Sequence, residues 1–177
     1  MLNAELTVLD WIQLHLRCPF LDLLIPFVSL LSNHGEIWIC LAVLLFLLRR
    51  QRRHGVSCAC ALALDLMACN LILKPLIGRG RPFLFRPELS LLVSPPGDAS
   101  FPSGHTAAAF AVVFALRASG SPLWRPALAL AAVTAFSRLY LYVHWPTDIL
   151  GGILLGAAVG WTGAKTAEFL LKKPANT

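Results

Sequence analysis

The stretch SRLYLYVHWPTD, residues 137–148, places Arg138, His144 and Asp148 at the seam between two long apolar segments. A charge at the centre of a bilayer costs about 3 kcal/mol on insertion scales, so such a cluster indicates a functional site. Pro146 suits the first position of a new helix, whose first turn then contains Asp148. The carboxylate can accept a hydrogen bond from one imidazole nitrogen and leave the other as a nucleophile or base. From this stretch alone, an interfacial histidine beside a helix cap remains an alternative.

The composition assigns the chain to the lipid bilayer. Hydrophobic residues make up 57% of its 177 residues, charged residues make up 14%, and the mean hydropathy is +0.69. Soluble domains are about 25% charged. The length predicts a single membrane-embedded domain over residues 1–177. The net charge of +6 comes without a basic stripe that carries interleaved aromatic residues, which excludes nucleic acid as a partner.

The apolar segments predict an all-α protein, a six-span transmembrane bundle with a short N-terminal interfacial helix. Residues 4–17 mix apolar and charged side chains and are too polar to span. Polar residues separate the first two spans and predict a helical hairpin, although each span is shorter than the ~20 residues that a crossing needs. The predicted spans are residues 20–31, 37–48, 56–77, 104–116, 122–143 and 146–171.

Basic residues orient the predicted bundle in the cell membrane. Residues 49–53 contain four arginines in RRQRR, and the positive-inside rule makes this loop cytoplasmic. Counting spans from this loop puts both chain ends in the cytoplasm, and puts residues 78–102 and the turn at His144 outside. Three arginines of the outer loop break the charge rule, which is a second indication of chemistry there. They are Arg79, Arg81 and Arg86.

Three stretches face the outer side and together predict binding of a phosphoryl group. They are KPLIGRGRP at 74–82, FPSGHT at 101–106 and the opening stretch at 137–148. Their cations Lys74, Arg81 and Arg138 can neutralise phosphate oxygens, arginine by two parallel hydrogen bonds. Carboxylates and cysteines at metal-ligand spacing are missing, so the sequence predicts no metal and no cofactor.

The second stretch predicts an anion-binding helix start. Ser103 is a natural N-cap, and the amides of Gly104 and His105 that follow it can bind an anion. Gly104 lets the backbone approach a ligand closely. His105 then lies in the first turn, where it can give or take a proton.

These stretches resemble the signature of the type 2 phosphatidic acid phosphatase family, which includes bacterial acid phosphatases and vanadium haloperoxidases. The signature is a lysine, six residues and Arg-Pro; then Pro-Ser-Gly-His; then Ser-Arg, five residues, a histidine, three residues and an aspartate. Residues 74–82, 102–105 and 137–148 contain every part of it. The six-helix membrane layout resembles the lipid phosphatase branch of the family.

The resemblance implies a role for each matched residue. His144 would be the nucleophile that takes the phosphoryl group, Asp148 would orient it, and His105 would protonate the leaving oxygen and later activate water. The phosphoryl oxygens would be held by Lys74, Arg81, Ser103, Gly104 and Arg138. Placed cations and amides stabilise a transition state whose charge is spread over three oxygens, so they can replace a metal. Arg138 and His144 do not share a face of an ideal helix, so Arg138 would have to reach around.

The expected function is therefore hydrolysis of a membrane lipid phosphate or diphosphate at the extracytoplasmic face, through a phosphohistidine. The small size and outward site favour the conversion of undecaprenyl diphosphate to undecaprenyl phosphate. Phosphatidylglycerophosphate, phosphatidate and lipid A phosphatases remain alternatives, because motifs that bind phosphate do not separate them. An anion or lipid transporter that uses the basic cluster as a binding site is the alternative from another class. The oligomeric state is left open.

Polar residues outside the signature carry separate expectations. Asp65, about 13 Å deeper along its helix than the lysine of the first motif, is expected to make a structural contact inside the bundle. Arg79 and Arg86 would bind a second phosphate or a lipid headgroup, or would be solvated.

Two aromatic and two polar residues complete this set. Tyr142 and Trp145 are expected to be interface aromatics. The predicted topology places His34 and Glu36 on the side of the phosphate-binding stretches.

Overall fold

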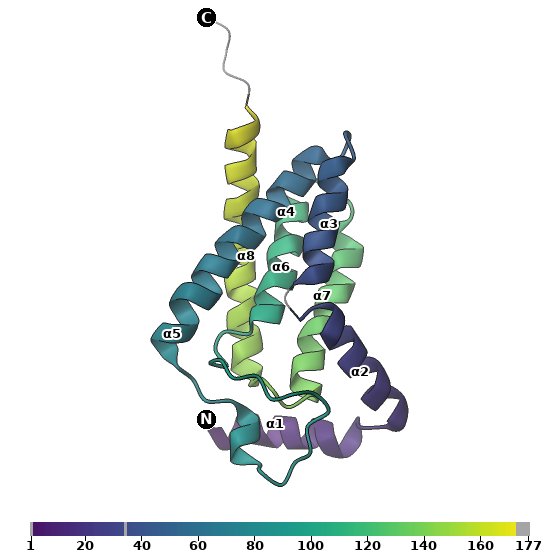
Figure 1. Ribbon diagram of the computed structural model, residues 1–177, viewed down its shortest axis with the longest axis vertical. Helices are drawn as coiled ribbons and strands as arrows, with labels where there is room; N and C mark the ends of the chain where they lie inside the picture. The colour runs from purple at the N-terminus through teal and green to yellow at the C-terminus, as the bar shows by residue number, and fades with distance from the viewer. Residues whose placement is uncertain (1, 34, 173–177) are drawn as a thin grey trace, which may run out of the picture.

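The computed structural model describes residues 2–33 and 35–172, and every regular element in these ranges is a helix. The predicted all-α class is confirmed. In chain order the elements are α1 Leu2–His15, α2 Pro19–Leu31, α3 Glu36–Leu47, α4 Arg52–Asp65, the π-helix η1 Leu66–Leu73, α5 Lys74–Ile77, the 3₁₀ turn η2 Pro82–Phe85, α6 Gly104–Ala118, α7 Trp124–Tyr140 and α8 Pro146–Leu171. Figure 1 shows a bundle with α1 lying across one end, together with the loop at 78–103 and the α7–α8 turn. We call this end the α1 end.

Helices α6 and α8 pack against each other with their backbones in close contact. A Cβ atom added at Gly156 would lie 2.6 Å from the backbone oxygen of Ala107, and one at Gly160 would lie 2.5 Å from that of Ala111. Small residues permit such approach between membrane helices. The Ser103 amide also donates to the Asp148 backbone oxygen at 3.1 Å. The starts of α6 and α8 are thereby fixed side by side.

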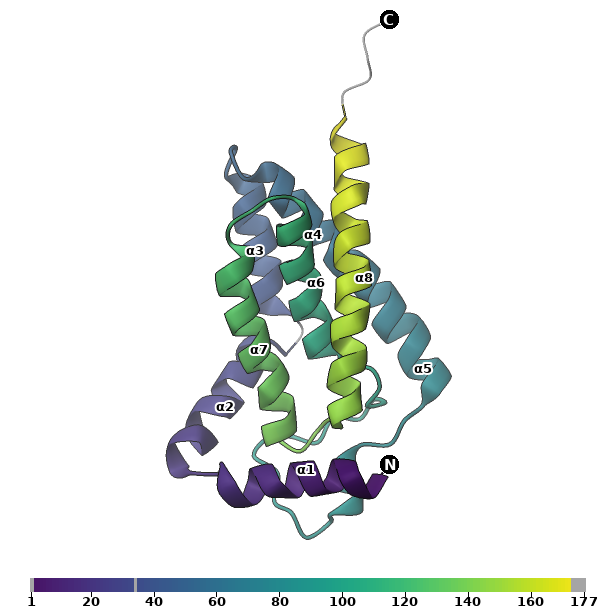
Figure 2. The same ribbon diagram turned by 180° about the vertical axis from the view of Figure 1, so that it is seen from behind.

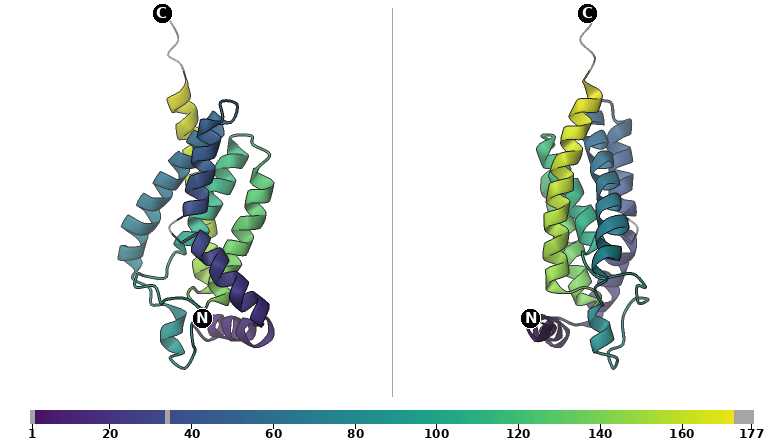
Figure 3. Two further views of the ribbon diagram at one scale, coloured as in Figure 1. Left: turned by 45° about the vertical axis from the view of Figure 1, so that its right-hand side comes forward. Right: turned by 90° about the vertical axis from the view of Figure 1, so that its left-hand side faces the viewer.

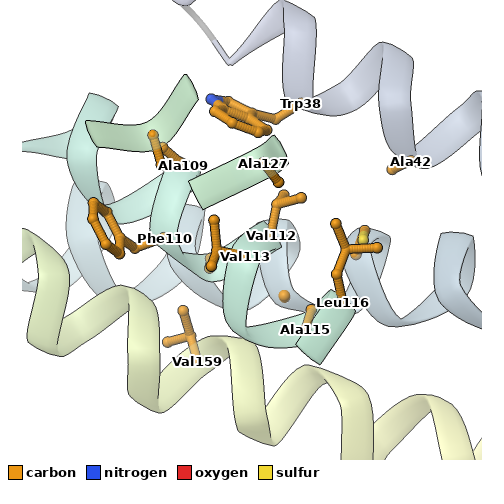
Figure 4. Close-up of a cluster of buried hydrophobic side chains, with 14 of the residues drawn as sticks. Trp38, Ala42, Ala109, Phe110, Val112, Val113, Ala115, Leu116, Ala127 and Val159 are labelled. Atoms are coloured by element: carbon orange, nitrogen blue, oxygen red, sulfur yellow. The ribbon is translucent and has the colours of Figure 1, made fainter. Parts of the chain in front are cut away.

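Helix α6 is the centre of the bundle. It contacts α4, α7 and α8, and Figure 4 shows its apolar side chains packed among residues of the surrounding helices. Trp38 of α3 is 1% exposed and Val112 and Leu116 of α6 are fully buried in this cluster. Figure 3 shows α8 running beside the α4–α5 stretch, which splays away from the bundle toward α5. The core therefore holds α6 rigidly and leaves α5 less covered.

Within residues 2–33 and 35–172, two helical stretches are long and apolar enough to cross a membrane, Arg52–Phe85 and Pro146–Leu171. The pair α2 and α3 adds a third if it is counted as one bent span. Large apolar side chains stand exposed on these outer surfaces, among them Leu23, Leu47 and Leu154. Such a surface suits a hydrocarbon environment.

The predicted hairpin of residues 20–31 and 37–48 is wrong. Helices α2 and α3 meet at a bend of 51° and continue in the same general direction, as Figures 1 and 2 show. They have 13 and 12 residues, so neither is long enough to span alone. Counted as one bent span, they make a single crossing in place of the two that the sequence predicted.

The correction changes where the chain ends lie. Helix α1 lies at the α1 end, whereas the carboxyl end of α8 lies at the opposite end of the bundle (Figure 1). Both chain ends were predicted to be cytoplasmic, and the structure has them at opposite ends of the bundle. The later predicted segments do form helices, and the segment at 146–171 coincides with α8.

Candidate active site

A cavity of about 590 Å³ near the α1 end brings together the three stretches that are predicted to bind phosphate. Six of the eight predicted site residues line it, and Ser103 and Asp148 stand directly behind them. The six are Lys74, Arg81, Gly104, His105, Arg138 and His144. Residues separated by up to 70 positions in the sequence thus surround one space.

His144 lies in the turn between α7 and α8 and is 1% exposed. Its Nδ1 is 3.2 Å from Asp148 Oδ2, and its Nε2 is 3.3 Å from Arg81 Nη1. A carboxylate only accepts hydrogen bonds and a guanidinium only donates them. The neutral ring therefore carries its proton on Nδ1, and Nε2 presents its lone pair. Burial, reinforced by the charges of Arg81 and Arg138, lowers the pKa of His144 well below its ordinary value, which keeps that lone pair available near neutral pH.

Asp148 is held from three directions and is fully buried. Besides His144, its Oδ2 accepts from the Trp145 amide at 2.9 Å, and its Oδ1 accepts from Arg79 Nη1 at 2.6 Å. Pro146 begins α8 and Asp148 lies in its first turn, as predicted. The carboxylate is thus fixed in the orientation that serves the His144 ring.

Arg79 connects this carboxylate to helix α1. Its Nη2 donates to Glu5 Oε2 at 2.7 Å and its Nη1 donates to Thr147 Oγ1 at 2.6 Å. Glu5 Oε1 in turn accepts from the Thr147 amide at 3.1 Å. Arg79, which was expected to bind a second phosphate or a lipid headgroup or to be solvated, is thus paired with two carboxylates and a hydroxyl. Sequence reasoning missed Glu5, because 74 residues separate it from Arg79.

The turn before His144 explains how Arg138 reaches the same cavity. Helix α7 ends at Tyr140, and Tyr142 follows in the left-handed region at φ 60°. Such a conformation costs a non-glycine residue of order 1–3 kcal/mol and is typical of functional sites. It turns the chain back, so His144 is not on the α7 helix and Arg138 need not reach around it. Arg138 is 3% exposed and donates from Nη1 to the Ser29 hydroxyl of α2.

The aromatic residues of this turn are buried, so their prediction as interface aromatics is wrong. Tyr142 is fully buried and its hydroxyl donates to Asp10 Oδ1 at 2.6 Å. Trp145 is 1% exposed and its indole donates to the Gly80 oxygen at 2.8 Å. Arg86, for which the same alternatives were expected as for Arg79, donates from Nη2 to Asp10 Oδ2 at 2.8 Å.

The start of α6 follows the predicted pattern. Ser103 is the N-cap, and its hydroxyl accepts from the Thr106 amide at 3.4 Å. A Cβ atom added at Gly104 would lie 3.6 Å from Lys74 Nζ, so this helix start faces the lysine at close range. His105 Nε2 is buried and has no hydrogen-bond partner within the described residues. It is free to exchange a proton with a ligand in the cavity.

Additional polar residues on the cavity wall come from the last residue of α4 and from the π-helix η1 that follows it. Its hydrogen bonds join residues five apart, and such segments are frequent at functional sites. Asp65 and Asn70, five residues apart, both line the cavity with Lys74. Asp65 was expected to make a structural contact, but its Oδ1 has no hydrogen-bond partner in the part of the chain that is described.

The remaining polar expectations concern the α2–α3 bend. His34 lies outside the described residues. Its neighbours Asn33 and Gly35 line the cavity, so the bend faces the side that the sequence predicted. Glu36 begins α3 directly after it. Among all described residues, no three His, Cys, Asp or Glu side chains lie close enough to hold a metal ion.

Comparison with known proteins identifies the family. Residues 55–170 match the model of the PAP2 superfamily, which covers more than half of the chain. The chain belongs to the PAP2 superfamily. The family resemblance of the three motifs is thereby confirmed, and the PAP2 superfamily includes membrane-embedded lipid phosphatases.

Two curated relatives have names that describe phosphatases of polyprenyl lipids. An undecaprenyl-diphosphatase of Sulfolobus acidocaldarius is 31% identical over 134 residues, which are 74% of this chain and 65% of the relative. A decaprenylphosphoryl-5-phosphoribose phosphatase of Mycobacterium tuberculosis is 37% identical over 134 residues, 73% of each chain. The chain therefore spans just under two thirds of the length of the first relative.

A solved structure shares the PAP2 fold. It is the transmembrane PAP2-type phosphatidylglycerolphosphate phosphatase of Bacillus subtilis, with a TM-score of 0.73 and 24% identity. The match covers 97% of this chain and 87% of that one. At this identity the likeness concerns the fold, in which the motif-bearing ends of α5, α6 and α7 and the start of α8 meet around one cavity.

Proposed function

We propose that this PAP2 protein is an integral membrane enzyme that hydrolyses a lipid phosphate or diphosphate through a phosphohistidine at His144. The observation that carries the proposal is the pairing of the buried ring, with Nδ1 on Asp148 and Nε2 turned toward Arg81. A buried imidazole that is oriented by a carboxylate and faces cations matches the needs of nucleophilic attack on a phosphoryl group.

In the first step the phosphoryl oxygens bind Lys74, Arg81 and Arg138 together with the amides at the start of α6. His144 Nε2 attacks phosphorus, and the bond from phosphorus to the leaving oxygen breaks as the P–N bond forms. His105 gives its proton to that oxygen. The phosphoryl charge beside His105 favours the protonated imidazole that this step requires.

In the second step His105 takes a proton from water, and the resulting hydroxide attacks phosphorus. The P–N bond breaks, inorganic phosphate leaves and His144 regains its lone pair at Nε2. The placed cations stabilise both transition states, a role for which one lost donor typically costs about 10² to 10³ in rate. Metal-independent catalysis follows as a prediction from this set of cations.

Undecaprenyl diphosphate is the substrate that we propose, with undecaprenyl phosphate as the product. The names of the two polyprenyl-lipid relatives support this choice. Apolar side chains of α3, α4 and η1, Ile39, Leu62 and Leu66, line one side of the cavity and suit an isoprenoid chain next to the phosphate. Phosphatidylglycerophosphate, phosphatidate and lipid A phosphates are the alternative substrates.

We also propose that the α1 end lies on the extracytoplasmic side of the cell membrane. The arginine-rich turn at residues 49–53 lies at the opposite end and is cytoplasmic by the positive-inside rule. The bundle then crosses five times, with α2 and α3 as one bent span. An outward site suits a lipid carrier released on that side.

Phosphate release by the purified protein in detergent tests the proposal. The panel contains undecaprenyl diphosphate, phosphatidylglycerophosphate, phosphatidate and a lipid A phosphate, each with and without excess chelator. We expect release to be fastest from the diphosphate and to persist in chelator. No release from any lipid would favour the transporter alternative, and strict magnesium dependence would contradict the assignment of the cations.

A further inference from the structure

Asp98, in the loop between η2 and α6, holds two of the cations that face the cavity. Its Oδ2 binds Lys74 Nζ and its Oδ1 accepts from Arg81 Nη2 at 2.6 Å. Both cations belong to the first motif, and Asp98 lines the same cavity as His144 and His105. No part of the PAP2 signature contains this residue.

The carboxylate presents to the two cations what a phosphoryl group would present. Two oxygens share one negative charge, and each oxygen binds a different cation by a charge-assisted hydrogen bond. Partial burial opposes the charge, but Lys74 and Arg81 outweigh it and lower the pKa of Asp98 to about 2. The group is therefore an anion at every pH at which the protein would be assayed.

We propose that Asp98 is an internal competitor of the phosphoryl group, which substrate displaces from Lys74 and Arg81 and which returns as phosphate leaves. This inference rests on the proposed function in one respect, that these two cations bind the phosphoryl group. It gives the loop a part in turnover, because a site with three cations and the amides at the start of α6 would otherwise retain the product phosphate. The carboxylate of Asp98 weakens the binding of free phosphate. A lipid substrate can still displace it, because the apolar chain of the lipid adds to the binding free energy.

The surroundings of Asp98 allow the exchange. Its side chain is 53% exposed, so the carboxylate can turn into water. Gly97 before it has open space, since an added Cβ would meet nothing within 4 Å. The residues that precede it, Pro95 and Pro96, limit the motion to the Asp98 end of the segment.

Arg81 keeps its position when the carboxylate leaves. Its Nη1 donates to the Val143 oxygen at 2.8 Å, and its Nε donates to the backbone oxygen of Asp98 at 2.9 Å. Neither bond involves the Asp98 side chain. Exchange of the carboxylate for a phosphoryl group therefore requires a side-chain rotation and no rebuilding of the site.

The test measures binding of inorganic phosphate and of vanadate to the purified full chain, by calorimetry and by inhibition of hydrolysis. Asp98→Asn and Asp98→Ala are compared with the wild type. Both variants lose the charged carboxylate that competes with the anion for Lys74 and Arg81. We therefore expect phosphate and vanadate to bind at least about tenfold more tightly to both variants than to the wild type. Glu88→Gln is the matched control, since Glu88 is an exposed carboxylate of the same loop, 4.0 Å from Arg86.

A positioning role for Asp98 predicts the opposite change in the affinity for phosphate. If the carboxylate aims Lys74 and Arg81 at the substrate, both variants bind phosphate more weakly, and that result overturns the proposal. Unchanged affinity, or no measurable phosphate binding to wild type and variants, overturns it as well. Tighter binding in a protein without hydrolysis would support the competitor and contradict the proposed function, so the two failures are distinguishable.

Discussion

The residues of the candidate active site come from two regions that are held in place by different forces. His105 and the His144–Asp148 pair stand at the starts of α6 and α8, where glycines let the backbones touch and the Ser103 amide bonds to Asp148. Lys74 and Arg81 stand at the edge of a long loop, and their partner is the half-exposed Asp98.

The difference separates two tasks. Close packing of apolar elements has few alternative arrangements and responds strongly to small changes in volume. Partly exposed ion pairs exchange with water and with ligands at low cost in free energy. The groups that would move protons and attack phosphorus are thus rigid, and two of the cations that would bind phosphate, Lys74 and Arg81, can change partners. Substitutions in the two regions should therefore differ in kind.

The largest effect is expected at the α6–α8 contact. Gly156→Leu would force side-chain atoms into the Ala107 backbone, which overpacks the interface by more than about 3 kcal/mol. We expect loss of folded protein in detergent, measured by gel filtration and thermal unfolding. Ala158→Leu on the exposed side of the same helix is the control and should remain folded. A folded and active Gly156→Leu variant would show that the two regions do not differ in rigidity.

Next in size is His105→Ala, which removes the proposed proton donor of the rigid region. The rate should fall by about 10² to 10⁴ for a phosphomonoester. The loss should shrink for a diphosphate, because its leaving group is a lipid monophosphate and needs no proton. Turnover numbers for both substrates measure this ratio. His54→Ala, at the opposite end and bonded to Ser119, should change neither rate; equal losses for both substrates would contradict the role of His105.

A smaller effect is expected from Arg79→Ala, which cuts the link from Asp148 to α1. Arg79 does not line the cavity, so KM should stay unchanged. The turnover number should fall roughly 10- to 100-fold, because the His144 ring loses its fixed orientation. Arg79→Lys should recover part of the rate, since lysine can still bind Asp148 Oδ1. A rise in KM with an unchanged turnover number would indicate that Arg79 binds substrate instead.

The smallest effect is expected from Arg86→Gln, at a partly exposed ion pair with Asp10. The hydrogen bond from Arg86, with a smaller one from Tyr142, lowers the pKa of Asp10 against partial burial. A lowered carboxylate pKa contributes stability above pH 3.8, the ordinary value, and loses it as the pH falls further. The melting temperature should therefore drop by less than about 3 °C at pH 7 and by still less below pH 4. A larger drop in melting temperature below pH 4 than at pH 7 would contradict this expected pH dependence.

The sequence was most informative where the interacting residues are close in the chain. Ser103 as an N-cap and Asp148 in the first turn of α8 follow from local rules of helix starts, and both were predicted. The local rules of helix starts could not predict the carboxylate partners of Arg79 and Arg81. Glu5 and Asp98 lie 74 and 17 residues from them, and a carboxylate in an amphipathic helix or a loop carries no sign of its partner.

The errors have physical causes of the same kind. A polar segment with a glycine predicts a break in the helix but not its angle, so a bend of 51° was mistaken for a reversal. Tyr142 and Trp145 next to an apolar segment resemble interface aromatics, yet α1 and the loop cover them. The left-handed turn at Tyr142, which no residue type announces, decides that Arg138 and His144 meet in one cavity.

The most direct measurement of the central proposal is the identity of the phosphorylated residue. Enzyme mixed with labelled lipid diphosphate is quenched rapidly without acid, because phosphohistidine is acid-labile, and the modified peptide is identified by mass spectrometry. We predict phosphohistidine at His144 in the wild type and in His105→Ala, and neither phosphoenzyme nor product in His144→Ala. A phosphoenzyme that persists in His144→Ala would contradict the assignment of the nucleophile.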